Sequence, residues 1–220
     1  DEETYRFIGY TQNENQLVVS SESAVKTVDF STIIATQPYK FYAVFVKDSV
    51  YNTPLDNSYF EFSSNNNADV SDGYHISPKA GVQFNGKITL PSEYNGKPIV
   101  GISGFNRQAN LTHVYWHGTP KLEIVNSNCF GSSSSSIPAL TKLQVVQLPD
   151  TVKFIGQYAF KGCSGLKPVD LSKLTKLERI ETFAFAASMT YSGEYPHFKI
   201  PGSVVFIGAT ALAYLGMPIA

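Results

Sequence analysis

A six-residue phrase that returns five times in the second half of the chain constrains the fold more than any other feature. Each copy begins with an aliphatic residue and ends with a large apolar one. The copies span 100–105, 125–130, 155–160, 180–185 and 207–212, so their last residues are spaced by 25, 30, 25 and 27 positions. Such a period is typical of stacked coils that cover one another's apolar faces. The sequence therefore predicts a solenoid of about five coils.

Each coil also contains a short strand in which two apolar residues flank one other residue. These strands are Ile88–Leu90, Val114–Trp116, Val146–Leu148, Val169–Leu171 and Phe198–Ile200, and three of them are followed by proline. Proline lacks a backbone donor and ends a strand ladder. Glycine at 101, 156 and 208 follows the first aliphatic residue of three copies. We expect a tight turn or positive φ there.

Side chains alternate across a strand, so the apolar residues face the core and their neighbours face outward. The predicted core comprises Val100, Phe105, Val125, Phe130, Ile155, Phe160, Ile180, Phe185 and Ile207. The outward positions form one row of Lys87, His113, Val145, Pro168 and His197, and a second row of Thr89, Tyr115, Gln147, Asp170 and Lys199. The sequence predicts that a ligand of protein size would bind across these two rows.

The first part of the chain is rich in strands but carries no repeat. Strands are predicted at 4–10, 16–20, 24–30, 39–46 and 59–62, and residues 69–78 form a turn-rich connector. We therefore expect two domains, a β-rich module over 1–80 and the solenoid over 81–220. The fold class is mainly β.

Composition excludes several kinds of partner. The 17 Lys and Arg residues against 18 Asp and Glu residues give a net charge of −1, so no basic field for nucleic acid exists. No apolar run is long enough to span a membrane. An export signal would have to lie upstream of Asp1. Cys129 and Cys163 are too few for a disulfide framework, and buried free thiols are the simpler reading, although a disulfide stays open.

No motif indicates catalysis, a cofactor or a metal. His113 and His117 are four residues apart but belong to a strand and its exit, whereas ligand pairs at that spacing need a helix. His75 and His197 are expected at the surface. No Gly-x-Ser-x-Gly elbow occurs. The acidic residues are too scattered for a glycosidase pair. Trp116 occupies an inward position, which favours a core role over sugar stacking.

The segment Leu143–Leu166 resembles the repeat of the BspA-like leucine-rich repeat family nearly residue for residue. It contains the family's Ile/Leu-Pro step at Leu148-Pro149, its Ile-Gly at Ile155-Gly156, and its Ala-Phe at Ala159-Phe160. The resemblance extends over about 82–215. It implies a leucine-rich-repeat solenoid. The coil at 111–130 departs from the pattern, and the last coil has Leu212 in place of Phe.

Residues 4–47 resemble the C-terminal half of an internalin-type B-repeat, a small β-grasp-like module. The residues that carry this likeness are Phe7–Tyr10 and Phe41–Phe45. Together the two resemblances imply an extracellular or cell-surface bacterial protein. They imply adhesion, or protein–protein binding, to a host or cell-surface protein or a glycan. The alternatives are a structural spacer in a larger surface protein and a carbohydrate-binding module.

Overall fold

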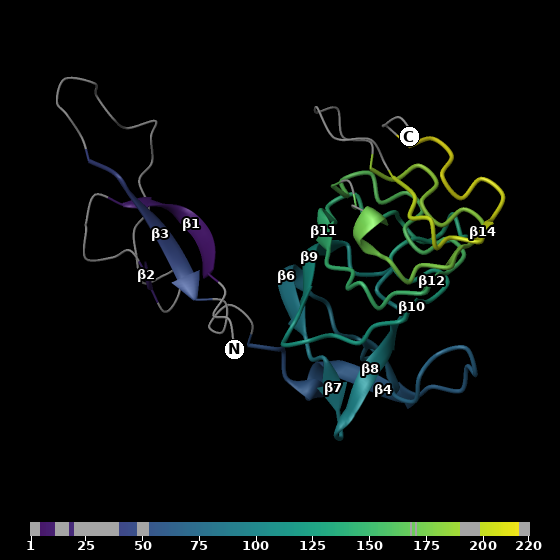
Figure 1. Ribbon diagram of the computed structural model, residues 1–220, viewed down its shortest axis with the longest axis horizontal. Coiled ribbons are helices and arrows are strands. Elements are labelled where there is room, and N and C mark those ends of the chain that lie inside the picture. Colours follow the sequence, from purple (N-terminus) through teal and green to yellow (C-terminus); the bar gives the residue numbers. More distant parts are fainter. Residues whose placement is uncertain are drawn as a thin grey trace. The chain divides into compact units, whose positions relative to one another are not determined.

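The computed structural model describes residues 5–11, 18–19, 40–47, 53–167, 169, 171–189 and 199–215 (Figure 1). Contacts divide the chain into two compact units, Asp1–Thr53 and Pro54–Ala220. The predicted boundary near residue 80 differs from this division. Residues 69–78 are not only a connector, because strand β5 (Tyr74–Pro78) pairs in parallel with β8 (Lys97–Ile102) of the first coil.

The first unit contains a three-stranded sheet in the order β1-β3-β2. Strand β3 (Tyr42–Lys47) pairs antiparallel with β1 (Tyr5–Thr11) and parallel with β2 (Val18–Val19). These strands confirm the predictions at 4–10, 16–20 and 39–46. The predicted strand at 24–30 lies outside the described residues.

The second unit is a mainly β solenoid of about five turns with two sheets on one core. The longer sheet runs in the order β14-β13-β12-β10-β8-β5-β4, and the shorter one in the order β11-β9-β6. Besides β5 and β8, the longer sheet contains β4 (Phe60–Ser64), β10 (Ile124–Val125), β12 (Phe154–Ile155), β13 (Arg179–Ile180) and β14 (Phe206–Ile207). The shorter one contains β6 (Asn85–Leu90), β9 (Asn110–Trp116) and β11 (Val145–Val146). A two-residue strand, β7 (Glu93–Tyr94), pairs with β8.

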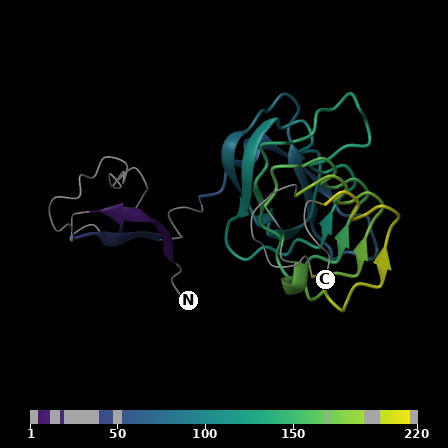
Figure 2. The same cartoon turned by 90° about the horizontal axis from the view of Figure 1, so that it is seen from above.

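The short strands of the longer sheet lie side by side in chain order (Figure 2). Their register brings Ile102, Val125, Ile155, Ile180 and Ile207 into one inward row. Ile102 therefore takes the place that the sequence assigned to Val100. Val100 is also buried, but its side chain packs beside Gly73. Ile207 is 46% exposed, since no described coil covers its far side, so its assignment to the core was wrong.

Phenylalanine rings form a continuous ladder through the core. Consecutive ring centroids from Phe84 through Phe105, Phe130 and Phe160 to Phe185 lie 6.1, 5.6, 5.3 and 5.0 Å apart. Phe60 packs on the first rung at 5.5 Å. The four predicted phenyl rungs are fully buried, which confirms the closing residues of the repeated phrase as the core.

The repeated glycines serve a different purpose from the one expected. Gly101, Gly156 and Gly208 do not have positive φ. At Gly156 and Gly208 a Cβ atom would stand 2.5 and 2.3 Å from backbone nitrogens of the preceding coil. At Gly101 it would stand 2.6 Å from the His75 ring. These residues are glycine because neighbouring chain passes too close for any side chain.

Within the described residues the shorter sheet has three strands, whereas five were predicted. Residues Leu171–Lys173 form a 3₁₀ turn instead of continuing a strand, and residues 199–200 are not in a strand. Backbone pairing still reaches Lys167, whose amide donates to the Gln144 carbonyl at 2.8 Å. The next residue in sequence is a proline, which has no amide hydrogen to extend the ladder.

The two cysteines are free thiols in the core. Burial raises the pKa of Cys129 well above its ordinary value and that of Cys163 to about 12. Both groups therefore stay protonated at neutral pH and behave as small hydrophobes.

Candidate binding surface

The outward residues of β6, β9 and β11, called the sheet face below, gather most of the predicted ligand-binding residues. Register places Lys87 beside His113 and His113 beside Val145, which confirms three members of the first row. Thr89 pairs with Tyr115 in the second row. The Gln147 amide donates to the Val114 carbonyl at 2.9 Å and continues that row.

Two predicted row members do not contribute to the sheet face as expected, and three others lie outside the described residues. Thr89 is only 8% exposed, and its carbonyl accepts a hydrogen bond from the Leu55 amide at 2.9 Å, so the segment after Pro54 covers it. Lys199 is exposed, but no described strand pairs it with the face. Asp170 and His197 lie outside the described residues, as does Pro168.

The structure also has a third outward row, which the sequence did not predict. The row consists of Thr112, Gln144 and Lys167, which lie next to one another on successive coils. The Gln144 amide donates to the Thr112 carbonyl and the Lys167 amide donates to the Gln144 carbonyl, each at 2.8 Å. This row borders a cleft of about 480 Å³, whose other lining residues are Thr141, Lys142 and Gly165. Each row residue directly follows a buried leucine, Leu111, Leu143 or Leu166, a spacing that could have identified the row.

The charged side chains that the structure describes on this surface are lysines. The Lys87 ammonium lies 5.8 Å from the centre of the Tyr115 ring, and the His113 ring stacks 6.0 Å from the same ring. Burial lowers the pKa of His113, and the positive charges of Lys167 and Lys87 lower it further. The imidazole is therefore neutral at neutral pH, and the remaining positive charge comes from lysines.

Trp116 is a core residue, as predicted. It is 1% exposed, and its indole nitrogen donates to the Gln147 carbonyl at 3.1 Å. Its backbone amide donates to the Gln147 Oε1 at 3.0 Å, so the Gln147 side chain also secures the strand. The Trp116 ring is not available to stack on a sugar.

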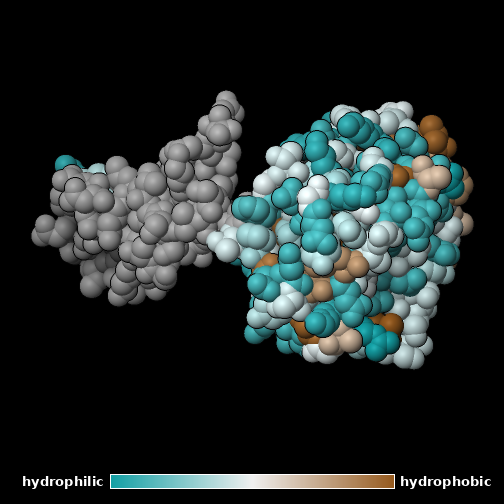
Figure 3. Space-filling view, turned by 90° about the horizontal axis from the view of Figure 1, so that it is seen from below, coloured by the Kyte–Doolittle hydropathy of each residue, from teal (hydrophilic) through white to brown (hydrophobic). Residues whose placement is uncertain are grey.

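The longer sheet has an outward row of its own, separate from the three rows of the sheet face. Ile124, Phe154, Arg179 and Phe206 share one register, and the Arg179 guanidinium lies 4.2 Å from the centre of the Phe206 ring. Of these, Phe206 is 37% exposed and the others are half-buried. Figure 3 shows another view, in which hydrophobic residues form small separate patches among hydrophilic ones.

His75 is half-buried, contrary to the surface position expected for it. Its Nε2 lies 3.1 Å from the Asn65 Oδ1, and its Nδ1 lies 3.0 Å from the Asn126 Nδ2. The Asn65 amide nitrogen donates to three carbonyls, so its oxygen must face the ring. This arrangement suits a neutral imidazole, and burial lowers the pKa of His75.

Glu123 secures the same loop from the neighbouring coil. Its carboxylate accepts hydrogen bonds from the amide and hydroxyl of Ser71 and from Lys153, whose Nζ lies 2.9 Å away. Burial raises the pKa of Glu123, but these hydrogen bonds together outweigh it and hold the pKa below its usual value. His75 and Glu123 are thus structural groups.

The described residues contain no group of three or more metal-ligating side chains. Nor does any helix in the described part of the chain have the length and hydropathy to cross a membrane.

Comparison with known proteins finds a similarity between the C-terminal coils and a repeat family. Residues 134–216 match the model described as BspA type Leucine rich repeat region (6 copies). The search of curated proteins gave no match. The chain is similar to the crystal structure of the T. pallidum leucine rich repeat protein TpLRR, at 19% identity and a TM-score of 0.41, over 74% of this chain and 69% of that one. No comparison supports the internalin-type resemblance of residues 4–47. The chain thus contains a BspA-type leucine-rich repeat region over residues 134–216.

Proposed function

We propose that this chain is a non-catalytic, extracellular or surface-attached bacterial protein that binds a protein partner through the sheet face, as an adhesin would. Leucine-rich repeats of this type are generally protein-binding. The observation that carries the proposal is the sheet face itself. Three hydrogen-bonded strands hold an aromatic ring, an imidazole, aliphatic carbon and lysines in fixed rows.

The chemistry of the sheet face favours a partner with acidic groups. Lys87 lies beside His113 in the first row, and Lys142 and Lys167 line the adjoining cleft. Because the whole chain carries a net charge of −1, this positive surface does not reflect a generally basic protein. Charge complementarity of this kind speeds association and selects partners, and it weakens as salt rises.

A binding panel tests the proposal. The biotinylated chain would be measured against purified matrix proteins, cell surfaces and a glycan array, at low and at physiological salt. We expect saturable binding to at least one protein, weakened about tenfold or more by the combined changes Lys87→Glu, Lys142→Glu and Lys167→Glu. The matched control reverses Lys121 and Lys176, which are equally exposed but lie outside the three rows.

Other results would identify another function. If a folded sample binds nothing in the panel, the chain acts as a spacer. If it binds only glycans, it is a carbohydrate-binding module; the burial of Trp116 argues against this. If Phe154→Ser abolishes protein binding while the lysine reversals leave it unchanged, the partner occupies the longer sheet instead.

A further inference from the structure

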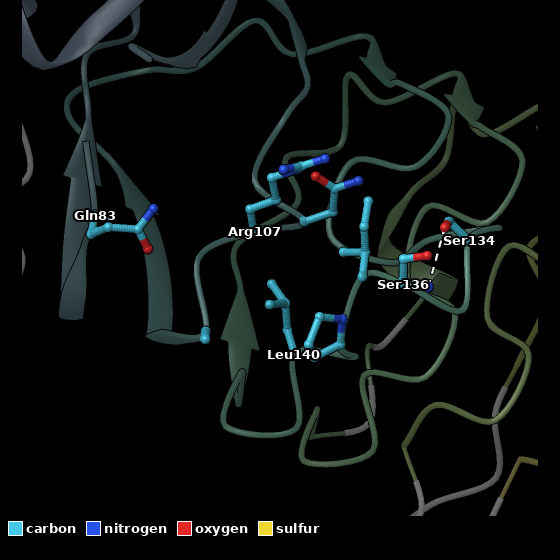
Figure 4. Close-up of a pocket in the computed structure, with 9 residues that line it drawn as sticks. Gln83, Arg107, Ser134, Ser136 and Leu140 are labelled. Carbon is cyan, nitrogen blue, oxygen red and sulfur yellow. Dashed lines mark hydrogen bonds between the residues drawn. The ribbon is translucent and has the colours of Figure 1, made fainter. Parts of the chain in front are cut away.

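A second cleft, called the serine-loop cleft below, opens where the 30-residue step inserts extra chain. It has a volume of about 590 Å³ and lies between the turn at 106–109 and the inserted loop at 134–138. Gln83, Arg107, Leu140, Ser134 and Ser136 surround the space (Figure 4). This volume is within the range of small-ligand sites.

The serine loop forms one wall of the cleft, and hydrogen bonds hold its backbone. Its backbone is secured by side-chain acceptors: the Ser133 amide donates to Asn128 Oδ1 at 2.8 Å, and the Ser134 amide to Ser132 Oγ at 3.0 Å. The Ser136 amide donates to Ser134 Oγ at 3.2 Å, the bond drawn in Figure 4. Serine hydroxyls of this kind stabilise turns.

The opposite wall is secured by a buried amide. Gln108 is 3% exposed; its Oε1 accepts from the Phe84 amide at 2.8 Å, and its Nε2 donates to the Val82 carbonyl at 3.0 Å. It therefore fixes the turn that carries Asn106 and Arg107 onto the first coil. Both walls exist before any ligand arrives, which lowers the entropic cost of binding.

The polar groups of the cleft have unused hydrogen-bonding capacity. Within the described part of the chain, the side chains of Gln83, Asn106 and Arg107 make no hydrogen bond or ion pair. Among the described residues no carboxylate lines the space, while Ile137 and Pro138 add apolar surface. A guanidinium with no anionic partner, beside neutral amides and hydroxyls, matches a ligand with one carboxylate.

We propose that the serine-loop cleft binds a small carboxylate-bearing ligand of monosaccharide or dipeptide size. Arg107 holds the carboxylate through a bidentate pair, and the amides of Gln83 and Asn106 hold the ligand's hydroxyl or amide groups. Ile137 and Pro138 contact its methyl or methylene groups. Two sources share this chemistry, an acidic sugar and the free C-terminus of a peptide. The inference is independent of the sheet face.

The test is an NMR titration of the ¹⁵N-labelled full chain. The probes are N-acetylneuraminate, glucuronate and acetyl-alanyl-alanine, each beside its methyl ester or amide, which lacks the charge. We expect at least one carboxylate to shift amide resonances of 106–109 and 132–138 saturably. Its uncharged counterpart should bind about tenfold more weakly or worse, because a charge-assisted pair is lost. Whether a sugar or the peptide binds identifies the source.

Variants assign the effect to the cleft. Arg107→Ala should weaken binding about tenfold or more, and Ser136→Ala by a few-fold, while Lys121→Ala, which removes an exposed charge elsewhere, should change nothing. Arg107 is exposed and unpaired within the described residues, so its removal leaves the fold intact. The inference is overturned if no carboxylate shifts these resonances, or if binding survives Arg107→Ala or loss of the ligand's charge.

Discussion

At the scale of single residues, two backbone constraints recur from coil to coil. Glycine stands where an adjacent coil leaves no room for a Cβ atom, as at Gly156 and Gly208. Three residues after four of the inward aliphatic residues, Val125, Ile155, Ile180 and Ile207, a non-glycine residue takes positive φ. These are Asn128, Tyr158, Phe183 and Thr210, with φ between 54° and 60°. The coil geometry therefore imposes a left-handed residue whatever side chain the sequence supplies.

Gly156→Ala should lower the free energy of unfolding by about 1–3 kcal/mol, because its Cβ would overlap the backbone of Asn126 and Ser127. Gly202→Ala is the matched control, since a Cβ there meets no atom within 4 Å. Chemical denaturation measures both. Equal midpoints for the two variants would contradict the close approach assigned to Gly156.

His75 should make stability depend on pH. Burial lowers the pKa of His75 in the folded state below its ordinary value of about 6.5. At a pH between the folded-state and unfolded-state pKa, the unfolded chain therefore binds a proton that the folded chain does not. Stability is therefore full above pH 6.5 and falls as the pH drops below it. We expect the free energy of unfolding, measured by denaturation between pH 5.5 and 7.5, to depend less steeply on pH in His75→Gln than in the unchanged chain. Adding His113→Gln should remove part of the pH dependence that remains. An unchanged slope in His75→Gln would refute this.

Sequence alone could place the glycines but could not explain them. A recurring glycine is consistent with positive φ or with close approach, and only the distance to the neighbouring coil separates these causes. The burial of His75 was likewise unpredictable. It depends on Gly101 and Asn126, which are distant in sequence and meet only because the coils stack.

At the scale of elements, the phenyl ladder was the most predictable feature. The spacing of the closing residues determined Phe105, Phe130, Phe160 and Phe185. The inward aliphatic row was less predictable, because its distance from the closing phenylalanine is not constant. Phe105 comes three residues after Ile102, whereas Phe130 comes five residues after Val125. Strand number was overestimated because an apolar-x-apolar pattern does not by itself specify a strand: Leu171, the last residue of the predicted strand Val169–Leu171, begins the 3₁₀ turn Leu171–Lys173.

Phe160→Ala should lower the free energy of unfolding by about 3–5 kcal/mol, since the ring is fully buried between two others and its loss leaves a cavity. Lys161→Ala should cost less than about 1 kcal/mol. It loses only the surface contact of its ammonium with the rings of Tyr158 and Phe183. Urea denaturation compares the two variants, and similar losses would mean that the assigned core is wrong.

At the scale of the whole molecule, the first coil packs against a preceding segment whose sequence has no repeat. Strands β4 and β5 extend the longer sheet, and Phe60 and Ile76 are part of the same core as the coils. This explains why the domain boundary could not be predicted. Residues 54–80 resemble ordinary strands and loops in sequence, yet they cover the first coil.

Two fragments test this organisation. A fragment of residues 54–220 should unfold with the midpoint of the full chain's solenoid, because the contacts divide between Thr53 and Pro54. A fragment of residues 81–220 should be much less stable and bind a hydrophobic dye, because it exposes Phe84 and Ile102. Equal stability of the two fragments would restore the boundary near residue 80.

The central claim is that the chain winds as parallel coils around one ladder of phenyl rings. Aromatic NOE spectroscopy with selectively labelled phenylalanine tests it most directly, because neighbouring centroids lie 5.0–6.1 Å apart. We expect cross-peaks linking Phe84 to Phe105, Phe105 to Phe130, Phe130 to Phe160, and Phe160 to Phe185, and none between the ends of the ladder. Rings without mutual cross-peaks, or a cross-peak between Phe84 and Phe185, would contradict it.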